Sequence, residues 1–216
     1  MTRSSVVING QLITVNEEPT NIWGITCKPQ MANFNNDADG ESFTRGCSRE
    51  VSNQNFDLVE RVAKDYMTSG VVEIGVARNE MGSFTYAMLN TKPDSIPYLG
   101  IDIHDKTFLN NKEKNIYTIQ EDSFNQETIR NYMKEIGMEK ISVLFIDGWH
   151  SVNAVINDWK YSDMLSDDGI VVFHDTNYHP GPAVFLEYID KELFRVEKHF
   201  EGQNDYGVGI AYRIKK

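Results

Sequence analysis

The sequence predicts an α/β fold, with a doubly wound and mostly parallel sheet that ends in an antiparallel hairpin. From about residue 55 to the C-terminus, apolar runs of strand length alternate with segments whose apolar residues recur at helical spacing. The run ISVLFIDG, residues 141–148, is almost continuously apolar, as a parallel strand covered on both faces requires. The last two apolar runs, 194–200 and 206–214, have no helical segment between them and so predict the hairpin.

The individual elements follow from the same two periods. Residues 55–67 are expected to form a helix, because Phe56, Val59 and Ala63 fall three and four residues apart. In such a fold, ligands lie beyond the carboxyl ends of the parallel strands, so residues at those ends are the candidates for a site. The other predicted helices are 83–89, 126–136, 151–165 and 182–193, and the predicted parallel strands are 71–76, 97–103, 115–122, 141–148 and 169–175.

The N-terminal segment differs from the rest of the chain. VVINGQLITV, residues 6–15, predicts a β-hairpin, since two apolar runs flank an Asn-Gly dipeptide that favours a type I′ turn. The stretch MANFNNDADGES, residues 31–42, has the composition of an exposed loop. We therefore expect two parts: an N-terminal hairpin with a lid or oligomerisation segment, residues 1–54, and a cofactor-binding domain, residues 55–216.

Composition excludes several classes of partner. The 216-residue chain carries a net charge of −11, which argues against binding a nucleic-acid backbone or an anionic membrane surface. Two cysteines form no disulfide framework, and no run approaches the roughly 20 apolar residues of a membrane span. The N-terminus lacks the apolar run of a signal peptide, so we expect a cytoplasmic protein that is free to form a homo-oligomer and acts on a small molecule.

A glycine-containing turn joins the first parallel strand to the next helix, in VVEIGVARNEMGSF, residues 71–84. A dinucleotide-binding loop needs G-x-G-x-x-G, but Ala77 takes the place of the second glycine. Glu80 in the same turn would repel a pyrophosphate. The motif is therefore poor for NAD, although ordinary turn glycines remain an alternative explanation. Glu73 lies inside the apolar run, where a carboxylate needs a partner.

Two further strand ends carry polar groups that suit a nucleoside. Asp102 ends the strand 97–103, where a carboxylate can accept two hydrogen bonds from a ribose diol. A helix cap or a solvated aspartate is the alternative. Asp122 and Ser123 end the next strand along the chain.

Together, the pattern E-x-G-x6-G after a strand, the acidic end of the second strand and the later LFIDGWH resemble the class I S-adenosylmethionine-dependent methyltransferases. The resemblance covers roughly residues 55–214 and is sharpest toward the macrocin and rhamnosyl O-methyltransferases, the methyltransferase-24 type. It implies a Rossmann-like sheet that binds S-adenosylmethionine, with Glu73 near the methionine end of the cofactor and Asp122 and Ser123 near the adenine amino group. The cofactor contacts that it implies come from Glu73, Gly75, Ala77, Gly82, Ser83, Asp102, Ile103, Asp122, Ser123, Asp147 and Trp149.

Two strand ends each deliver an aspartate and a histidine: Asp147 with His150, and His174 with Asp175. If the two strands are neighbours, the two carboxylates lie close together and repel each other unless a cation lies between them. The resemblance carries metal ligation over to Asp147, Asp175 and, as a weaker third ligand, Asn177. Relatives often have two acids where this chain has His174 and Asp175. The implied ion is Mg²⁺ or Mn²⁺.

His150 is the candidate general base, because imidazole has an unperturbed pKa near 6.5. A histidine that caps or packs on the following helix is the alternative. With Asp147 as the second catalytic residue, we expect methyl transfer to an oxygen of a small hydroxylated acceptor, such as a sugar, a phenol or a related natural product. Three rival functions remain: an NAD-dependent oxidoreductase, a non-catalytic binding domain and a cephalosporin-hydroxylase-like relative.

Overall fold

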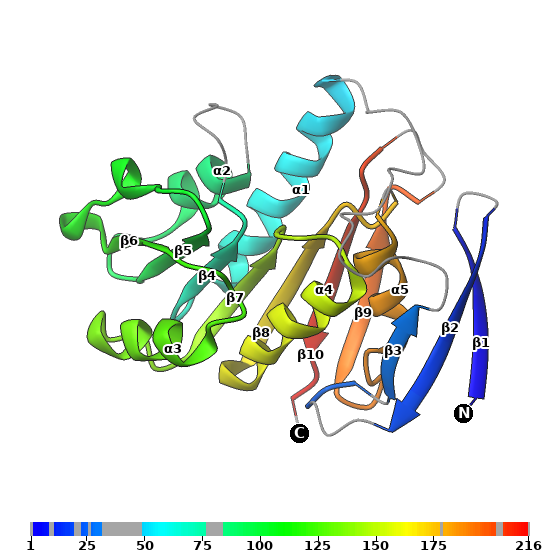
Figure 1. The fold of residues 1–216 in the computed structure, drawn as a ribbon. Helices are drawn as coiled ribbons and strands as arrows, with labels where there is room; N and C mark the ends of the chain where they lie inside the picture. The colour runs from blue at the N-terminus through cyan, green and yellow to red at the C-terminus, as the bar shows by residue number, and fades with distance from the viewer. Residues whose placement is uncertain are drawn as a thin grey trace.

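The computed structural model describes residues 2–8, 11–19, 23–25, 27–31, 49–76, 84–177, 179–201 and 205–215. Its centre is a seven-stranded sheet in the order β6-β5-β4-β7-β8-β10-β9, with β6 at one edge and β9 at the other (Figure 1). The strands from β6 to β8 are parallel, whereas β10 is antiparallel to both β8 and β9. The sheet consists of β4 (Val71–Ile74), β5 (Tyr98–Asp102), β6 (Ile116–Gln120), β7 (Ile141–Ile146), β8 (Leu165–His174), β9 (Phe194–His199) and β10 (Val208–Arg213).

Helices cover both faces of this sheet, because alternate side chains of each strand enter opposite cores. In β7, Leu144 and Ile146 join one core, and Val143 and Phe145 join the other. Side chains of α3 (Gln126–Glu135), α4 (Val152–Trp159) and α5 (Pro180–Tyr188) fill the first core. Those of α1 (Arg49–Tyr66) and α2 (Phe84–Thr91) fill the second. The prediction of a doubly wound, mostly parallel sheet with a C-terminal antiparallel hairpin is therefore confirmed.

In this sheet and its helices, the boundaries differ from the expected ones by four or more residues at four places. One is the expected helix 182–193, which is observed as α5 and ends at Tyr188. Helix α1 begins at Arg49, six residues before the predicted start at residue 55. The earlier start was not predicted because residues 49–54 are mainly polar and show no apolar period. The proposed division after residue 54 therefore falls within this helix. The expected helix 151–165 is α-helical only to Trp159 and continues as the 3₁₀ segment η3, Lys160–Met164. Strand β8 begins at Leu165, which pairs with Ile141 across a register shift.

A second, three-stranded antiparallel sheet forms from β1 (Thr2–Ile8), β2 (Gln11–Pro19) and β3 (Cys27–Met31). The predicted hairpin is therefore present, while β3 was not expected. Strand β3 lies against α4 and α5 (Figure 1). Between the two sheets, Ile25 enters the core and Trp159 Nε1 donates a hydrogen bond to the carbonyl oxygen of Trp23, with the two atoms 2.7 Å apart. None of the helices in the described ranges has the length and apolar character to cross a membrane.

Candidate active site

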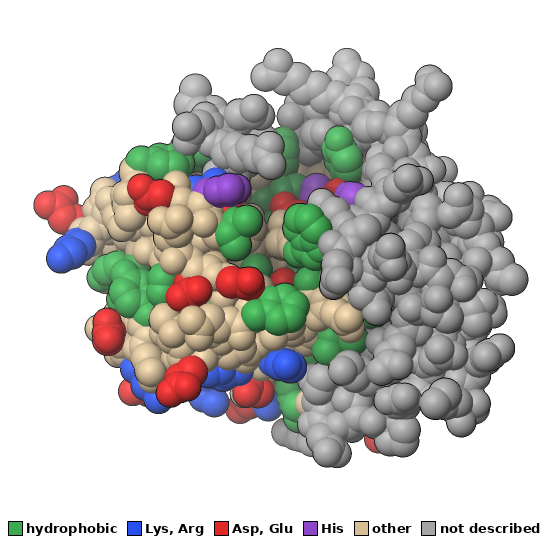
Figure 2. Space-filling view, viewed as in Figure 1, with side chains coloured by type: hydrophobic (Ala, Val, Ile, Leu, Met, Phe, Trp, Pro, Cys, Tyr) green, Lys and Arg blue, Asp and Glu red, His purple; other side chains and the backbone are tan. Residues whose placement is uncertain are grey.

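A cavity of about 1020 Å³ opens at the carboxyl ends of the parallel strands. It lies where the strand order reverses between β4 and β7, the switch point at which α/β sheets bind ligands. Figure 2 shows histidine and acidic side chains among apolar ones on the upper part of the face in view. The residues that line the cavity include Glu73, Gly75, Asp102, Ile103, Asp122, Ser123, Asp147, Trp149, His150 and His174, which the sequence had singled out.

Gly75 allows the tips of β4 and β7 to meet. Its φ of 86° lies in the left-handed region, where side chains other than glycine are strained. A Cβ atom at this position would also lie 2.1 Å from the carbonyl oxygen of Asp147. Gly75 is therefore required by both backbone conformation and close approach, and it brings Asp147 to the edge of the cavity.

Glu73 is buried beneath the cavity, with 1% of its surface exposed. Burial raises the pKa of its carboxyl from 4.5 to about 8, against the opposing effect of hydrogen bonds from the Tyr98 and Thr85 hydroxyls. The Thr85 Oγ1 donor lies 2.7 Å from Oε1. The buried carboxyl therefore has the partners that its position in the strand demands, and it is neutral over much of the physiological pH range.

Asp102 is held at the end of β5 by backbone donors. Its Oδ2 accepts a hydrogen bond from the Val76 amide at 3.0 Å, and its Oδ1 accepts one from the His104 amide at 2.7 Å. The ammonium group of Lys106 lies 3.6 Å from Oδ2 and donates to the Val76 carbonyl at 2.8 Å. Because each carboxylate oxygen has two lone pairs, this arrangement orients Asp102 and leaves it able to accept further hydrogen bonds from a ligand.

Exposed apolar side chains flank the next part of the cavity. Ile103 is 60% exposed and Trp149 is 51% exposed, although both are large apolar residues. Asp122 Oδ1 accepts from the Phe124 amide at 3.0 Å, and the Ser123 carbonyl accepts from the Tyr161 hydroxyl at 2.8 Å. A slot between these two side chains, with polar groups nearby, would be suited to a heteroaromatic ring.

Behind this slot, Asp158 on α4 is fully buried. Burial raises the pKa of its carboxyl to about 7, while hydrogen bonds with Ser123 and Asn157 act in the opposite direction. Its position indicates a structural role, because it lies beneath Gly148 and does not line the cavity.

At the other end of the cavity, side chains from β7, β8 and the loops after them converge. His150 Nε2 lies 3.0 Å from Asp175 Oδ2 and 3.6 Å from Asp147 Oδ1. His174 Nδ1 lies 3.1 Å from Asp147 Oδ1 and 3.5 Å from Asp175 Oδ2. Two carboxylates and two imidazoles thus alternate around a closed ring, because β7 and β8 are adjacent and parallel.

Local backbone structure fixes the positions of His150 and Asp175. His150 directly precedes α4, whose N-cap Ser151 accepts a hydrogen bond from the Ala154 amide at 3.2 Å. The first turn of α5 packs on the same point: the Gly181 amide donates to the His150 carbonyl at 3.0 Å, and a Cβ at Gly181 would lie 2.2 Å from that oxygen. Asp175 takes a left-handed φ of 59°, which aspartate tolerates better than most residues.

The charges in this ring depend on one another. Burial acts to lower the pKa of His174, but the carboxylates of Asp175 and Asp147 outweigh burial and raise it to about 10. Burial acts to raise the pKa of Asp175, but the imidazoles of His174 and His150 hold it well below its usual range. His174 is consequently an imidazolium and Asp175 a carboxylate at neutral pH when nothing else is bound.

Ala77, Gly82 and Ser83 fall outside the described residues. Asn177 follows β8 as expected, but its Nδ2 donates to the carbonyls of Phe200 and Asp205, at 2.9 and 3.1 Å, so its amide is engaged with the loop before β10.

The structure also adds residues that the sequence interpretation had missed. Lys106 lies beneath Asp102, and the ring of His179 stacks on His150 with 4.1 Å between their centroids. A His-Pro-Gly sequence at the start of a helix was the available signal for His179.

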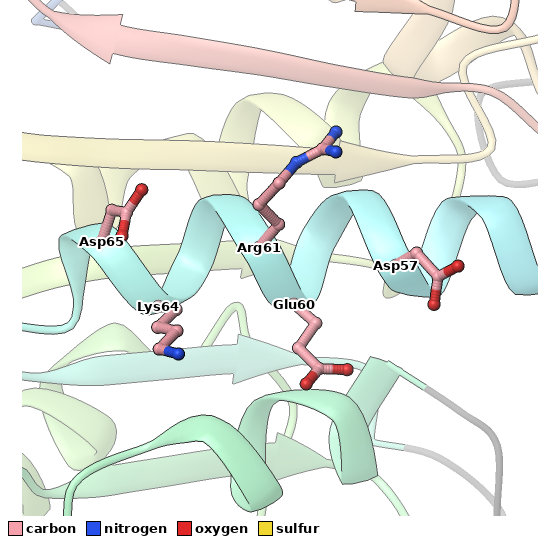
Figure 3. A pocket seen from close by; sticks show the side chains of 5 residues that line it. All are labelled: Asp57, Glu60, Arg61, Lys64 and Asp65. Carbon is pink, nitrogen blue, oxygen red and sulfur yellow. The ribbon is translucent and has the colours of Figure 1, made fainter.

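A second hollow lies away from the strand ends, along the outer face of α1 (Figure 3). Its volume is about 470 Å³. All the side chains that line it come from this one helix and carry both signs of charge, as on a solvated helix surface. They are Asp57, Glu60, Arg61, Lys64 and Asp65.

A methyltransferase-domain model, that of the methyltransferase-24 family, matches residues 72–176. The matched segment is similar to a methyltransferase domain. The matched segment runs from β4 to the loop after β8 and contains all four members of the carboxylate and imidazole ring. No curated protein sequence matches the chain.

Solved structures share the fold of this domain at low identity. The MycE methyltransferase from the mycinamycin biosynthetic pathway, in complex with Mg, SAH and mycinamycin VI, superposes with a TM-score of 0.55 and 18% identity over 74% of this chain and 49% of its own. The O-methyltransferase from Bacillus cereus in complex with SAH superposes with a TM-score of 0.57 and 11% identity, over 74% of this chain and 81% of its own. TomG, an O-methyltransferase from Streptomyces achromogenes in complex with SAM, superposes with a TM-score of 0.53 and 12% identity, over 74% of this chain and 79% of its own. The chain spans about half the length of MycE and has the class I methyltransferase fold.

Proposed function

We propose that this protein transfers the methyl group of S-adenosylmethionine to an oxygen of a small hydroxylated acceptor, such as a sugar or a phenol. One observation carries the proposal: a single cavity in the methyltransferase domain joins a nucleoside-like end, at Asp102, to a cluster of carboxylates and imidazoles, at His150. Cofactor and acceptor can therefore meet within one cavity. The complexes of MycE with SAH and mycinamycin VI and of TomG with SAM support this pairing.

The cofactor is placed across the strand tips. Asp102 would accept hydrogen bonds from the ribose diol, because backbone donors already orient its carboxylate toward the cavity. Ile103 and Trp149 would enclose the adenine ring, and Asp122 and Ser123 would lie at its polar edge. The methionine end would lie over Gly75 and Glu73, which directs the sulfonium methyl toward His150.

His150 is proposed as the general base. As the acceptor oxygen attacks the methyl carbon, its proton moves to the imidazole of His150, the C–S bond breaks, and the sulfonium becomes the neutral thioether of S-adenosylhomocysteine. Asp175 and Asp147 lie 3.0 and 3.6 Å from His150 Nε2 and would stabilise the imidazolium that forms. The cavity would hold the two reactants close to each other, which lowers the entropic cost of the transfer.

The residues present also fit a divalent cation. Asp147 and Asp175 bring two carboxylates to adjacent strand ends, and hard divalent cations prefer such oxygen ligands. A cation held there would lower the pKa of an acceptor hydroxyl and orient it. Residues 1–54 are proposed as a lid or an oligomerisation segment on the acceptor side, since β3 lies against α4 and α5.

Calorimetric titrations of the purified chain with S-adenosylmethionine, S-adenosylhomocysteine and NAD test the proposal. We expect heat from the first two ligands and none from NAD, because Ala77 and Glu80 make a poor pyrophosphate loop. Methyl transfer from labelled cofactor to a panel of sugars and phenols then tests the reaction class. Binding of NAD in place of the methyl donor would favour the oxidoreductase alternative and reject the proposal.

A further inference from the structure

Three possible ligand atoms converge where β7 and β8 end. They are Asp147 Oδ1, His174 Nδ1 and Asp175 Oδ2, and all three lie within 4.8 Å of one another. The nitrogen is 3.1 Å from the first oxygen and 3.5 Å from the second. The side chain of Asp175 is 11% exposed and that of His174 12%, so both are largely withdrawn from solvent. This group has the composition and compactness of a metal-ligand set with one nitrogen and two oxygens.

The spacing of these atoms suits one ion. Bonds from a divalent transition ion to imidazole nitrogen and carboxylate oxygen are about 2.0–2.2 Å long, so two ligands at right angles lie roughly 3 Å apart. The two nitrogen-to-oxygen distances already approach this separation. Only small side-chain movements are needed to place all three atoms around a common centre.

The imidazole of His174 is held in this orientation by its neighbours. The ring of Phe84 meets it edge-on at 4.5 Å, and the ring of Tyr206 lies at 5.6 Å on a tilted plane. The amide nitrogen of Asn177, by contrast, donates to two backbone carbonyls. His174 is therefore better placed than Asn177 to complete the set.

A second group, His150, Asp175 and His179, is compact enough to be considered. A metal lies in the plane of an imidazole that binds it. The rings of His150 and His179 are stacked, with 13° between their planes and 4.1 Å between their centroids. Their in-plane lone pairs run side by side and do not converge, so this group is the weaker candidate.

We propose that Asp147, His174 and Asp175 bind a first-row transition ion, such as Mn²⁺, in preference to Mg²⁺. Mg²⁺ demands oxygen ligands and retains its waters, whereas imidazole nitrogen binds transition ions more strongly. The inference deepens the proposed function and rests on it, because the ion would lie beside the acceptor hydroxyl and next to His150. The set does not include the nitrogens of His150, so it is compatible with the proposed proton transfer to His150.

The test is a titration of the full chain with Mn²⁺, followed by electron paramagnetic resonance of the unbound ion. We expect about one bound ion per chain, and we expect Mg²⁺ to displace it only at a concentration at least roughly tenfold higher than that of Mn²⁺. Equal affinity for the two ions, or no binding of Mn²⁺, would overturn the proposal. The titration is run without cofactor, so its failure is distinct from a failure to bind S-adenosylmethionine.

Variants identify the ligand. His174→Ala should weaken Mn²⁺ binding by roughly tenfold or more, the range reported even for residues that only support a ligand. His179→Ala, the matched control, should leave Mn²⁺ binding unchanged. The reverse result would place the ion in the other group and overturn the assignment. If His174→Ala does not fold, pulsed resonance on the wild-type protein with Mn²⁺ still decides, because an absent coupling to imidazole nitrogen contradicts the proposal.

Discussion

His150 Nε2 lies 3.0 Å from Asp175 Oδ2, and this contact joins the loop after β7 to the loop after β8. The two residues are 25 positions apart in sequence, yet the adjacency of the parallel strands brings them together. A carboxylate at this distance stabilises the protonated imidazole, and that is the state a general base reaches as the methyl group is transferred. The contact therefore gives the base assignment a physical reason that His150 alone does not provide.

Replacement of His150 tests that assignment directly. His150→Ala should lower kcat by roughly 10²–10⁴-fold, the usual contribution of a positioned base. Affinity for S-adenosylmethionine should change little, because the imidazole of His150 is not one of the proposed cofactor contacts. His199→Ala is the control, since His199 lies on β9 and does not line the cavity. Unchanged turnover in His150→Ala would dismiss the base assignment.

His179 should act on the reaction through His150. The two rings stack at 4.1 Å, so His179→Ala would loosen the base and should lower kcat by up to roughly 10²-fold with little effect on the KM for the acceptor. His179→Phe keeps a flat ring and should retain most of the activity. Steady-state kinetics of both variants provide the measurement. A phenylalanine variant as inactive as the alanine variant would indicate that stacking is not the contribution of His179.

Asp102 is expected to control cofactor affinity. Asp102→Asn removes the charged acceptor for the ribose diol and should weaken binding of S-adenosylhomocysteine by roughly 10–100-fold, as expected for the loss of about 1.5–3 kcal/mol. Asp105→Asn in the same loop is the control, because the Asp105 carboxylate accepts from the Thr107 amide and lies away from the cavity lining. Calorimetry measures both affinities, and equal losses in the two variants would contradict the role of Asp102.

Alanine substitutions at Gly75 and Gly137 separate two effects on stability, the strain of a left-handed backbone and the steric clash of an added Cβ. Both have a positive φ, 86° and 75°, but a Cβ at Gly75 would lie 2.1 Å from the Asp147 carbonyl, whereas one at Gly137 meets nothing within 4 Å. Gly137→Ala should lower the free energy of unfolding by about 1–2 kcal/mol, the cost of the left-handed conformation. Gly75→Ala should cost clearly more. Urea unfolding of both variants gives the comparison, and similar losses would show that the strand tips separate freely.

The raised pKa of the Glu73 carboxyl predicts that the stability of the fold depends on pH. Burial raises the pKa of its carboxyl from 4.5 to about 8, so between these values the folded protein keeps a proton that the unfolded chain has released. Stability is therefore lost as the pH rises through this window. Glu73→Gln, which resembles the neutral acid, should lack this contribution.

The measurement is the free energy of unfolding of the wild type relative to Glu73→Gln, from pH about 5 to about 8. It should fall by an amount on the order of a few kcal/mol. Asp158, whose pKa is raised to about 7, titrates in both proteins, so the difference isolates Glu73. A difference that stays constant with pH would contradict the burial argument.

The fold could be predicted from the sequence because its signals are local. The near-continuous apolar run of β7 and the helical spacing of α1 each record which faces of an element are buried. A doubly wound sheet follows from the alternation of such elements, and so does the expectation that polar strand ends share one edge. The polar first turns of α1 carried no such signal, and neither did β3, whose short strand lies in a segment without apolar period.

The sequence by itself determined the class of fold and the strand ends at which Asp102, Asp147 and Asp175 lie, since alternating burial is encoded residue by residue. Only the tertiary structure decided that β10 lies between β8 and β9, that Lys106 supports Asp102, and that His179 stacks on His150. These contacts join segments distant in sequence. They depend on how helices and loops pack over the strand ends, and no local period of apolar residues records that packing.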